Sequence, residues 1–172
     1  NEKAQSLFIS YTNISVLIVN SGVHGWNDVG HTATQVSGNV YGYYPKTDNV
    51  FKSDGVMKTT TRAVFDNKYK PEGYKDFTLK VTQAQANLVA ANLNAYVSNP
   101  GTYSILDTQC TNISCSSIIQ AGINLQNYQY NHGDPGPSPI STSLLTPNGF
   151  GNILNLSINS SIVTGQQYFI GN

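Results

Sequence analysis

Charged residues are scarce in this sequence, and their scarcity excludes several classes of protein. Only 10% of the 172 residues are Asp, Glu, Lys or Arg, and the formal net charge is zero. A broad basic footprint is therefore not expected, and no nucleic-acid partner is predicted. Apolar residues make up 39% of the chain, and Tyr occurs 11 times. A disordered tail would instead be rich in charge and poor in aromatic side chains.

Long apolar runs and cysteine clusters are also lacking. The longest apolar run, Val16–Val19, has the length of a strand and is far below the roughly 20 residues of a membrane helix. We therefore predict no stable membrane insertion. Two cysteines are too few for a disulfide framework, and with three histidines they show no metal-ligand spacing. No phosphate loop or dinucleotide fingerprint is present, so neither a metal nor another cofactor is predicted.

The length fits one domain, which we place over residues 1–172. The charge is uneven, because all nine basic residues and seven of the nine acidic residues lie within the first 80 residues. Most of these cations could form a mildly basic flank: Lys46, Lys52, Lys58, Arg62, Lys68, Lys70, Lys75 and Lys80. The simpler interpretation is a solvated loop region with interspersed acids.

Strand patterns dominate the first half of the chain. Residues 6–20 predict one strand or a hairpin, and residues 31–36 and 40–44 predict two strands joined by a turn at Ser37–Asn39. Residues 46–61 have the composition of a polar loop. Two further strands are predicted at residues 61–65 and 76–81.

Helix signals begin at Thr82. Thr82 and Gln85 have the spacing of a capping box before a helix over residues 83–97, which the turn at residues 98–101 ends. A second helix is predicted over residues 111–121, with Gly122 as its stop. Residues 131–151 hold four of the seven prolines and predict a long loop packed by Leu144, Leu145 and Phe150. The tail, 152–170, could close a sheet edge.

Cys110 stands at the start of the second predicted helix, directly after the polar residues 107–109. A thiolate is the reactive form of cysteine, and a helix N-terminus stabilises it through unpaired amides and the helix dipole. Backbone amides at such a position could also form part of an oxyanion hole. The alternative is a buried, inert cysteine, which is the usual state of a free cysteine and the interpretation we give to Cys115.

A thiol hydrolase also needs a base, and the chain offers three histidines. His132 lies in the segment rich in Gly and Pro. His24 and His31 flank residues 25–30, and His31 begins a strand after a glycine. That position allows its ring to face the end of an adjacent helix.

Three short segments carry a resemblance to a known family: Gly30-His31-Thr32-Ala33, the strand ending Tyr41-Gly42-Tyr43-Tyr44-Pro45, and residues 103–123 around Cys110. Together they resemble the permuted branch of the NlpC/P60 papain-like superfamily, in which a histidine strand precedes a cysteine helix. The resemblance covers roughly residues 29–123. It implies an α+β, papain-like fold in permuted order, with an antiparallel sheet and the nucleophile helix packed against it.

The resemblance also implies roles for single residues. Cys110 would be the nucleophile and His31 the general base. A third polar residue on the following strand would orient the imidazole, and Tyr43 lies nearest to the expected place. Weaker substitutes are Gln35, Asn39 and Asp28. Gln109 stands where the family usually has Asn, and it could donate a hydrogen bond to an oxyanion.

The function implied is a cysteine-dependent amidase or peptidase. Its expected substrate is peptidoglycan, attacked by a secreted or delivered bacterial effector toxin, and a toxin implies an immunity protein as partner. One alternative keeps the fold and changes the reaction to lipid acyl hydrolysis, acyl transfer or protein deamidation. Another alternative is a non-catalytic carbohydrate-binding or adhesion module with a merely buried cysteine.

Overall fold

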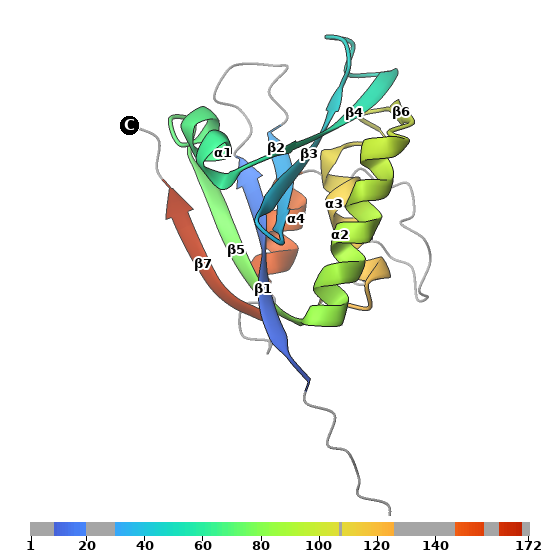
Figure 1. Ribbon diagram of the computed structural model, residues 1–172. Helices are drawn as coiled ribbons and strands as arrows, with labels where there is room; N and C mark the ends of the chain where they lie inside the picture. Colours follow the sequence, from blue (N-terminus) through green and yellow to red (C-terminus); the bar gives the residue numbers. More distant parts are fainter. Residues whose placement is uncertain (1–8, 20–29, 107, 126–146, 157–161, 170–172) are drawn as a thin grey trace, which may run out of the picture.

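The computed structural model describes residues 9–19, 30–106, 108–125, 147–156 and 162–169. These residues form seven strands and four helices (Figure 1). In chain order the elements are β1 (Tyr11–Val19), β2 (His31–Val36), β3 (Asn39–Pro45), β4 (Ser53–Thr60), α1 (Arg62–Tyr69), β5 (Tyr74–Thr82), α2 (Gln83–Ser98), β6 (Thr102–Tyr103), α3 (Cys110–Gln120), α4 (Pro147–Leu156) and β7 (Val163–Phe169).

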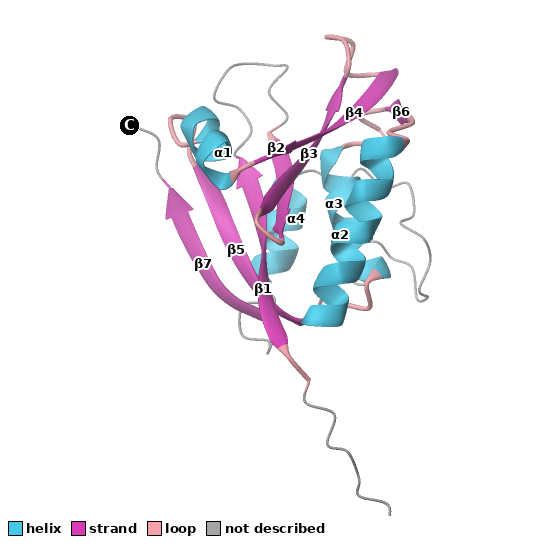
Figure 2. Ribbon diagram, in the orientation of Figure 1, coloured by secondary structure: helices cyan, strands magenta, loops and turns pink. Residues whose placement is uncertain are grey.

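The strands form one sheet in the order β6-β4-β3-β2-β1-β5-β7, and every neighbouring pair is antiparallel. Helices α2, α3 and α4 cover one face of this sheet, while α1 covers the other face (Figure 2). The coarse prediction of an α+β protein with an antiparallel sheet and a packed cysteine helix is therefore confirmed.

Strand alternation divides the apolar side chains between two cores. On β1, Val16 and Ile18 join the larger core beneath α2, α3 and α4, whereas Leu17 and Val19 join the smaller core beneath α1. Successive strand residues point to opposite faces, so a strand covered on both sides reads as a continuous apolar run. The run Val16–Val19 marks such a strand, and all four side chains are buried.

Several predicted elements are confirmed. The hairpin joining β2 to β3 turns at Ser37 and Gly38, whose φ angles of 52° and 81° are those of a tight two-residue hairpin turn. Thr82 and Gln85 form the predicted capping box of α2. Gly122 follows α3 with a φ of 75°. The predicted edge strand near the C-terminus is β7, although residues 152–156 belong to α4.

Two predictions for the middle of the chain were wrong. The predicted polar loop 46–61 contains β4, in which Gly55 and Met57 face inward and alternate with polar or more exposed residues. The predicted strand 61–65 is instead the start of α1. Thr61 caps this helix by accepting a hydrogen bond from the Val64 amide, and Phe65 and Tyr69 bury one helical face.

The predicted loop 131–151 was wrong at its C-terminal end. Residues 147–151 open helix α4, which buries Phe150, Ile153 and Leu154 in the larger core. Phe150 therefore packs inward as predicted, but from a helix. Leu144 and Leu145 lie outside the described residues.

Candidate active site

Strand β2 loses its β3 partner near its N-terminal end. The pairing of β2 with β1 runs as far as Val19 and His31, whereas its pairing with β3 ends at Ala33 and Gly42. At His31 and Thr32 the strand is therefore paired on one side only. The N-terminus of α3 packs at this point, where the hydroxyl groups of Thr32 and Thr111 lie 3.0 Å apart.

Cys110 is the first residue of α3, as the sequence predicted to within one residue. The thiol is 4% exposed, and it lies 3.7 Å from Gln109 Oε1 and 3.9 Å from Thr111 Oγ1. Gln109 caps the helix by accepting a hydrogen bond from the Thr111 amide at 3.1 Å. The cysteine thus sits in the first turn, where free backbone amides and the helix dipole favour an anion.

Burial raises the pKa of the Cys110 thiol above its ordinary value. Hydrogen bonding from the backbone amide of Thr32, the hydroxyl and amide of Thr111, and the amide of Cys110 opposes this effect only in part. The resting cysteine is therefore a protonated thiol at neutral pH. The surrounding amides nevertheless stabilise negative charge whenever it forms there.

Cys115 has a different environment. Its side chain is fully buried in the larger core, and burial alone raises its pKa. Both cysteines are free. The predicted core role of Cys115 agrees with this environment.

His31 lies on the α1 face of the sheet. Its ring stacks on Tyr44 with centroids 4.5 Å apart and on Tyr69 of α1 at 5.6 Å. Burial, reinforced by the positive charge of Lys68, lowers the pKa of the imidazole to about 3. His31 is therefore neutral at physiological pH, and its buried Nε2 has no hydrogen-bond partner among the residues that the structure describes.

Cys110 and His31 do not hydrogen-bond to each other in this structure. The residue after His31 connects them, because the Thr32 amide reaches the Cys110 sulfur. Tyr44, which stacks on the imidazole, is close enough for an ionised Cys110 to contribute to its raised pKa, after the larger effect of burial. However, Thr32 faces α3, so alternation turns His31 to the opposite face. Contact between sulfur and Nε2 requires a side-chain rotation or a bridging water.

The structure places Tyr44, not Tyr43, against the imidazole. Tyr43 points into the larger core, where it stacks on Tyr103 and donates a hydrogen bond to the Pro100 carbonyl at 2.7 Å. Alternation explains the difference, because residues 43 and 44 face opposite sides of β3. Tyr44 carries the polar contact near His31, since its hydroxyl lies 3.1 Å from that of Tyr69.

The remaining candidate residues are not brought to the imidazole. The Gln35 side-chain oxygen accepts a hydrogen bond from Arg62 at 2.8 Å, and Asn39 lies exposed at the hairpin. His24, Asp28 and His132 lie outside the described residues. For Gln109, the oxygen faces the thiol, so the predicted oxyanion donor would have to be its Nε2 group or a backbone amide.

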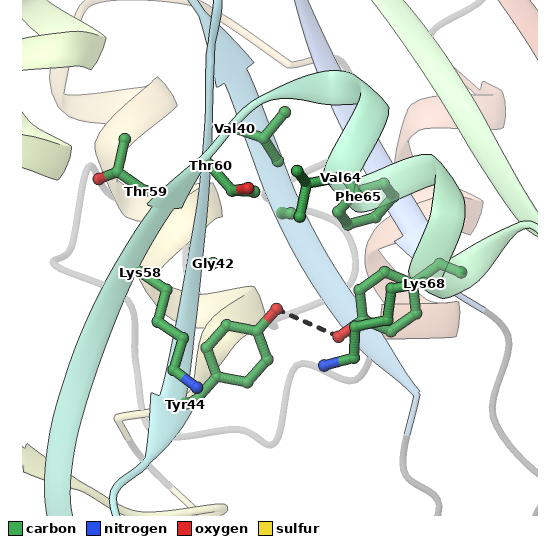
Figure 3. Close-up of a pocket in the computed structure, with 11 residues that line it drawn as sticks. Val40, Gly42, Tyr44, Lys58, Thr59, Thr60, Val64, Phe65 and Lys68 are labelled. Atoms are coloured by element: carbon green, nitrogen blue, oxygen red, sulfur yellow. Dashed lines mark hydrogen bonds between the residues drawn. The ribbon is translucent and has the colours of Figure 1, made fainter.

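A groove opens beside His31 on the α1 face, and no sequence pattern had indicated it (Figure 3). Its volume is about 420 Å³. The lining comes from β2, β3, β4 and α1: Ala33, Val40, Gly42, Tyr44, Lys58, Thr59, Thr60, Val64, Phe65, Lys68 and Tyr69. On β3 the lining residues are the alternate positions Val40, Gly42 and Tyr44, and this spacing is the sequence signal that could have indicated the groove.

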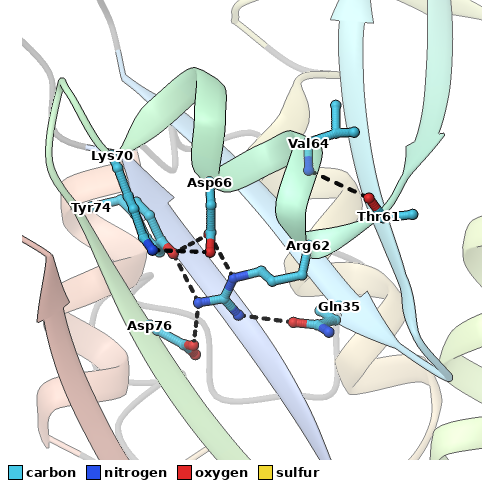
Figure 4. Close-up of polar contacts among 8 residues, drawn as sticks. All are labelled: Gln35, Thr61, Arg62, Val64, Asp66, Lys70, Tyr74 and Asp76. Carbon is cyan, nitrogen blue, oxygen red and sulfur yellow. Dashed lines mark hydrogen bonds and ion pairs between the residues drawn. The ribbon is translucent and has the colours of Figure 1, made fainter.

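An ion-pair network lies on the same face, around Arg62 (Figure 4). Arg62 donates to Asp66 at 2.9 Å and to Asp76 at 2.8 Å, and it also donates to Gln35 and Tyr74. Burial alone would lower the pKa of Arg62, but these hydrogen bonds raise it above its ordinary value. These contacts tie α1 to β2 and β5, so we interpret this network as structural.

The described residues contain no group of three or more His, Cys, Asp or Glu side chains that could hold a metal ion. Within those same ranges, no helix has the length and hydropathy to cross a membrane. Comparison with known proteins found no matching family model, no matching curated protein and no matching solved structure.

Proposed function

We propose that this protein is a cysteine-dependent hydrolase of amide bonds, with Cys110 as nucleophile and His31 as general base. The observation that carries the proposal is the buried Nε2 of His31, which has no hydrogen-bond partner among the described residues and belongs to the residue before Thr32, whose amide reaches the thiol at the N-terminus of α3. Buried polar atoms without a partner are rare in folded proteins and are often retained for catalysis. A neutral imidazole can accept a proton, but a pKa lowered to about 3 makes His31 a weak base as it stands in this structure.

The chemistry follows from these protonation states. The resting pair is a thiol and a neutral imidazole, so the first step moves the thiol proton from Sγ to Nε2. The thiolate then attacks an acyl carbon, and the leaving group takes the proton from the imidazolium. Backbone amides of the first turn of α3 would stabilise the oxyanion, each at about 3 kcal/mol. Water finally hydrolyses the acyl-enzyme.

The substrate we propose is peptidoglycan, with the protein acting as a secreted or delivered bacterial effector and an immunity protein as its partner. The papain-like resemblance around residues 30–33 and 103–123 supports this, together with a surface of low charge. A second candidate is hydrolysis or transfer of a lipid acyl group on the same dyad. The groove with apolar lining beside His31 favours that reaction.

Thiol labelling tests the dyad directly. With limiting iodoacetamide at neutral pH, we expect Cys110 to be alkylated about tenfold faster than Cys115, which is fully buried and serves as an internal control. His31→Gln should slow labelling of Cys110 by about tenfold and leave Cys115 unchanged, because only Cys110 has the imidazole as a proton acceptor. Mass spectrometry of the digested protein quantifies both sites.

Two outcomes would contradict the proposal. One is equal labelling of both cysteines, and the other is labelling of Cys110 that is indifferent to His31. Either would leave a binding or adhesion module as the better account. Release of soluble fragments from purified peptidoglycan, lost in Cys110→Ser, then separates the peptidoglycan proposal from the lipid alternative.

The pH dependence of labelling distinguishes a thiol–imidazole pair from a preformed ion pair. Because burial raises the pKa of Cys110, the thiolate fraction should increase about tenfold per pH unit from about pH 6 to about pH 8. The His31 imidazole, whose pKa is lowered to about 3, stays neutral over that range and adds no inflection. A flat rate across the same range would mean that a thiolate–imidazolium pair already exists.

A further inference from the structure

The groove on the α1 face combines an apolar lining with cations at one end. Ala33, Val40 and Phe65 are buried beneath it, and Val64 of α1 lines it while remaining 56% exposed. Lys58 of β4 and Lys68 of α1 also line the groove. The groove therefore has an apolar surface for the body of a ligand and two cations for a charged group at its end.

The two lysines converge on a single ring. Lys58 Nζ lies 5.1 Å from the centroid of Tyr44, and Lys68 Nζ lies 5.2 Å from the same centroid (Figure 3). Neither ammonium forms a salt bridge with any carboxylate in the described part of the chain. Two cations beside one ring, with no salt bridge to the described carboxylates, create a positive potential that attracts an anion.

The groove also adjoins the imidazole. Tyr44 and Tyr69 line it and stack on His31, and a Cβ at Gly42 would lie 3.0 Å from His31 Nε2. The positive charge of Lys68 reaches the imidazole and contributes to its lowered pKa. A ligand in the groove would therefore end beside the proposed general base.

We infer that this groove binds a carboxylate carried on an apolar body, with Lys58 and Lys68 holding the carboxylate and the Ala33–Val40–Phe65 floor holding the apolar part. Resting on the proposed function, this ligand would be part of the substrate or of the released product. A volume of about 420 Å³ lies within the usual range of small-molecule sites. The same chemistry occurs in a fatty acid and in a peptide with a free C-terminal carboxylate.

Calorimetric titration with octanoate and its neutral isostere octanamide tests the charge requirement. Octanoate should bind about tenfold more tightly than octanamide, and Lys58→Gln with Lys68→Gln should remove that preference. Lys80→Gln is the matched control, because Lys80 makes the same kind of contact, 5.0 Å from the ring of Tyr11, and does not line the groove. Val64→Glu, at an exposed position, should weaken octanoate binding by adding an anion without disturbing the core.

A second titration distinguishes the two sources of the carboxylate. N-acetyl-dileucine, compared with its C-terminal amide, represents the peptide source, and octanoate represents the fatty-acid source. Preference for the charged member of either pair supports the inference and identifies its source. Equal binding of charged and neutral members in both pairs, or a preference that survives the double lysine variant, overturns it. Cys110→Ser should bind these probes as the wild type does. Ligand binding in the groove can therefore be tested independently of the proposed nucleophile.

Discussion

Replacing Gly42 by alanine is expected to slow acyl turnover by about 100-fold while the protein remains folded. A Cβ at this position would lie 2.8 Å from a ring carbon of Tyr44, 2.9 Å from the Tyr44 hydroxyl and 3.0 Å from His31 Nε2. Both rings must therefore move away from residue 42. Misplacing a catalytic group by about 1 Å can cost about 100-fold in rate.

The fold should tolerate this change, because the atoms that meet the new methyl group belong to side-chain ends rather than to backbone. Overpacking of this kind typically costs about 1–3 kcal/mol. Gly165→Ala on β7 is the matched control, since its Cβ would meet only Thr78 at 3.9 Å, an ordinary contact. Hydrolysis of a p-nitrophenyl ester, followed together with thermal unfolding, separates the two effects.

Normal turnover in a folded Gly42→Ala protein would show that the placement of His31 and Tyr44 does not matter for the reaction. The proposed general base would then have to be sought elsewhere in the chain. Loss of turnover in the Gly165→Ala control as well would indicate a general effect of filling glycine positions, not an effect at this site.

Arg62→Leu is expected to lower the free energy of unfolding by about 3 kcal/mol. The change removes the cation from Asp76, whose side chain is only 11% exposed and whose Oδ1 already lacks a hydrogen-bond partner in the described part of the chain. Removing one partner of a buried ion pair leaves an uncompensated charge, which costs about 3–5 kcal/mol. We take the lower end of that range, because Arg62 itself is 24% exposed.

Urea unfolding measures this loss as a shift of the midpoint at constant slope. Lys70→Leu is the control, because Lys70 pairs with Asp66 at 3.4 Å with half of its own side chain exposed. An exposed pair of this kind should contribute less than about 1 kcal/mol. Adding Asp76→Asn to Arg62→Leu should recover part of the stability, because it removes the unpaired charge. Equal losses for Arg62→Leu and Lys70→Leu would contradict the network's structural role.

The two proposed catalytic side chains lie on opposite faces of the sheet. Cys110 belongs to the face covered by α2, α3 and α4, while His31 stacks against Tyr69 of α1 on the other face. The β2–β3 pairing ends at Ala33 and Gly42, directly after His31 and Thr32. The relative placement of Cys110 and His31 in the proposed dyad therefore depends on the packing of β2, β3 and α3 together, and not on any one of these elements.

Local signals in the sequence determined most of the regular elements. Residues 6–20 predicted a strand or a hairpin, the turn at residues 37–39 predicted a hairpin, and the capping box at Thr82 and Gln85 set the start of α2. These features depend on backbone conformations and hydrogen bonds within a few residues, so the chain specifies them without its tertiary context. The placement of Cys110 at a helix N-terminus followed from the same kind of signal.

Tertiary structure alone decided the elements with weak local patterns. β4 was missed because Lys58 and Thr59 resemble a polar loop until Met57 is known to face the larger core. α1 was predicted as a strand, and only the packing of Phe65 and Tyr69 in the smaller core favours a helix there. The surroundings of His31 were missed for a similar reason. Whether Tyr43 or Tyr44 touches the imidazole depends on the register between β2 and β3, and a shift of one residue reverses every side chain. Lys58 lies on β4 and Lys68 on α1. Only the packing of these two elements brings both cations to the ring of Tyr44.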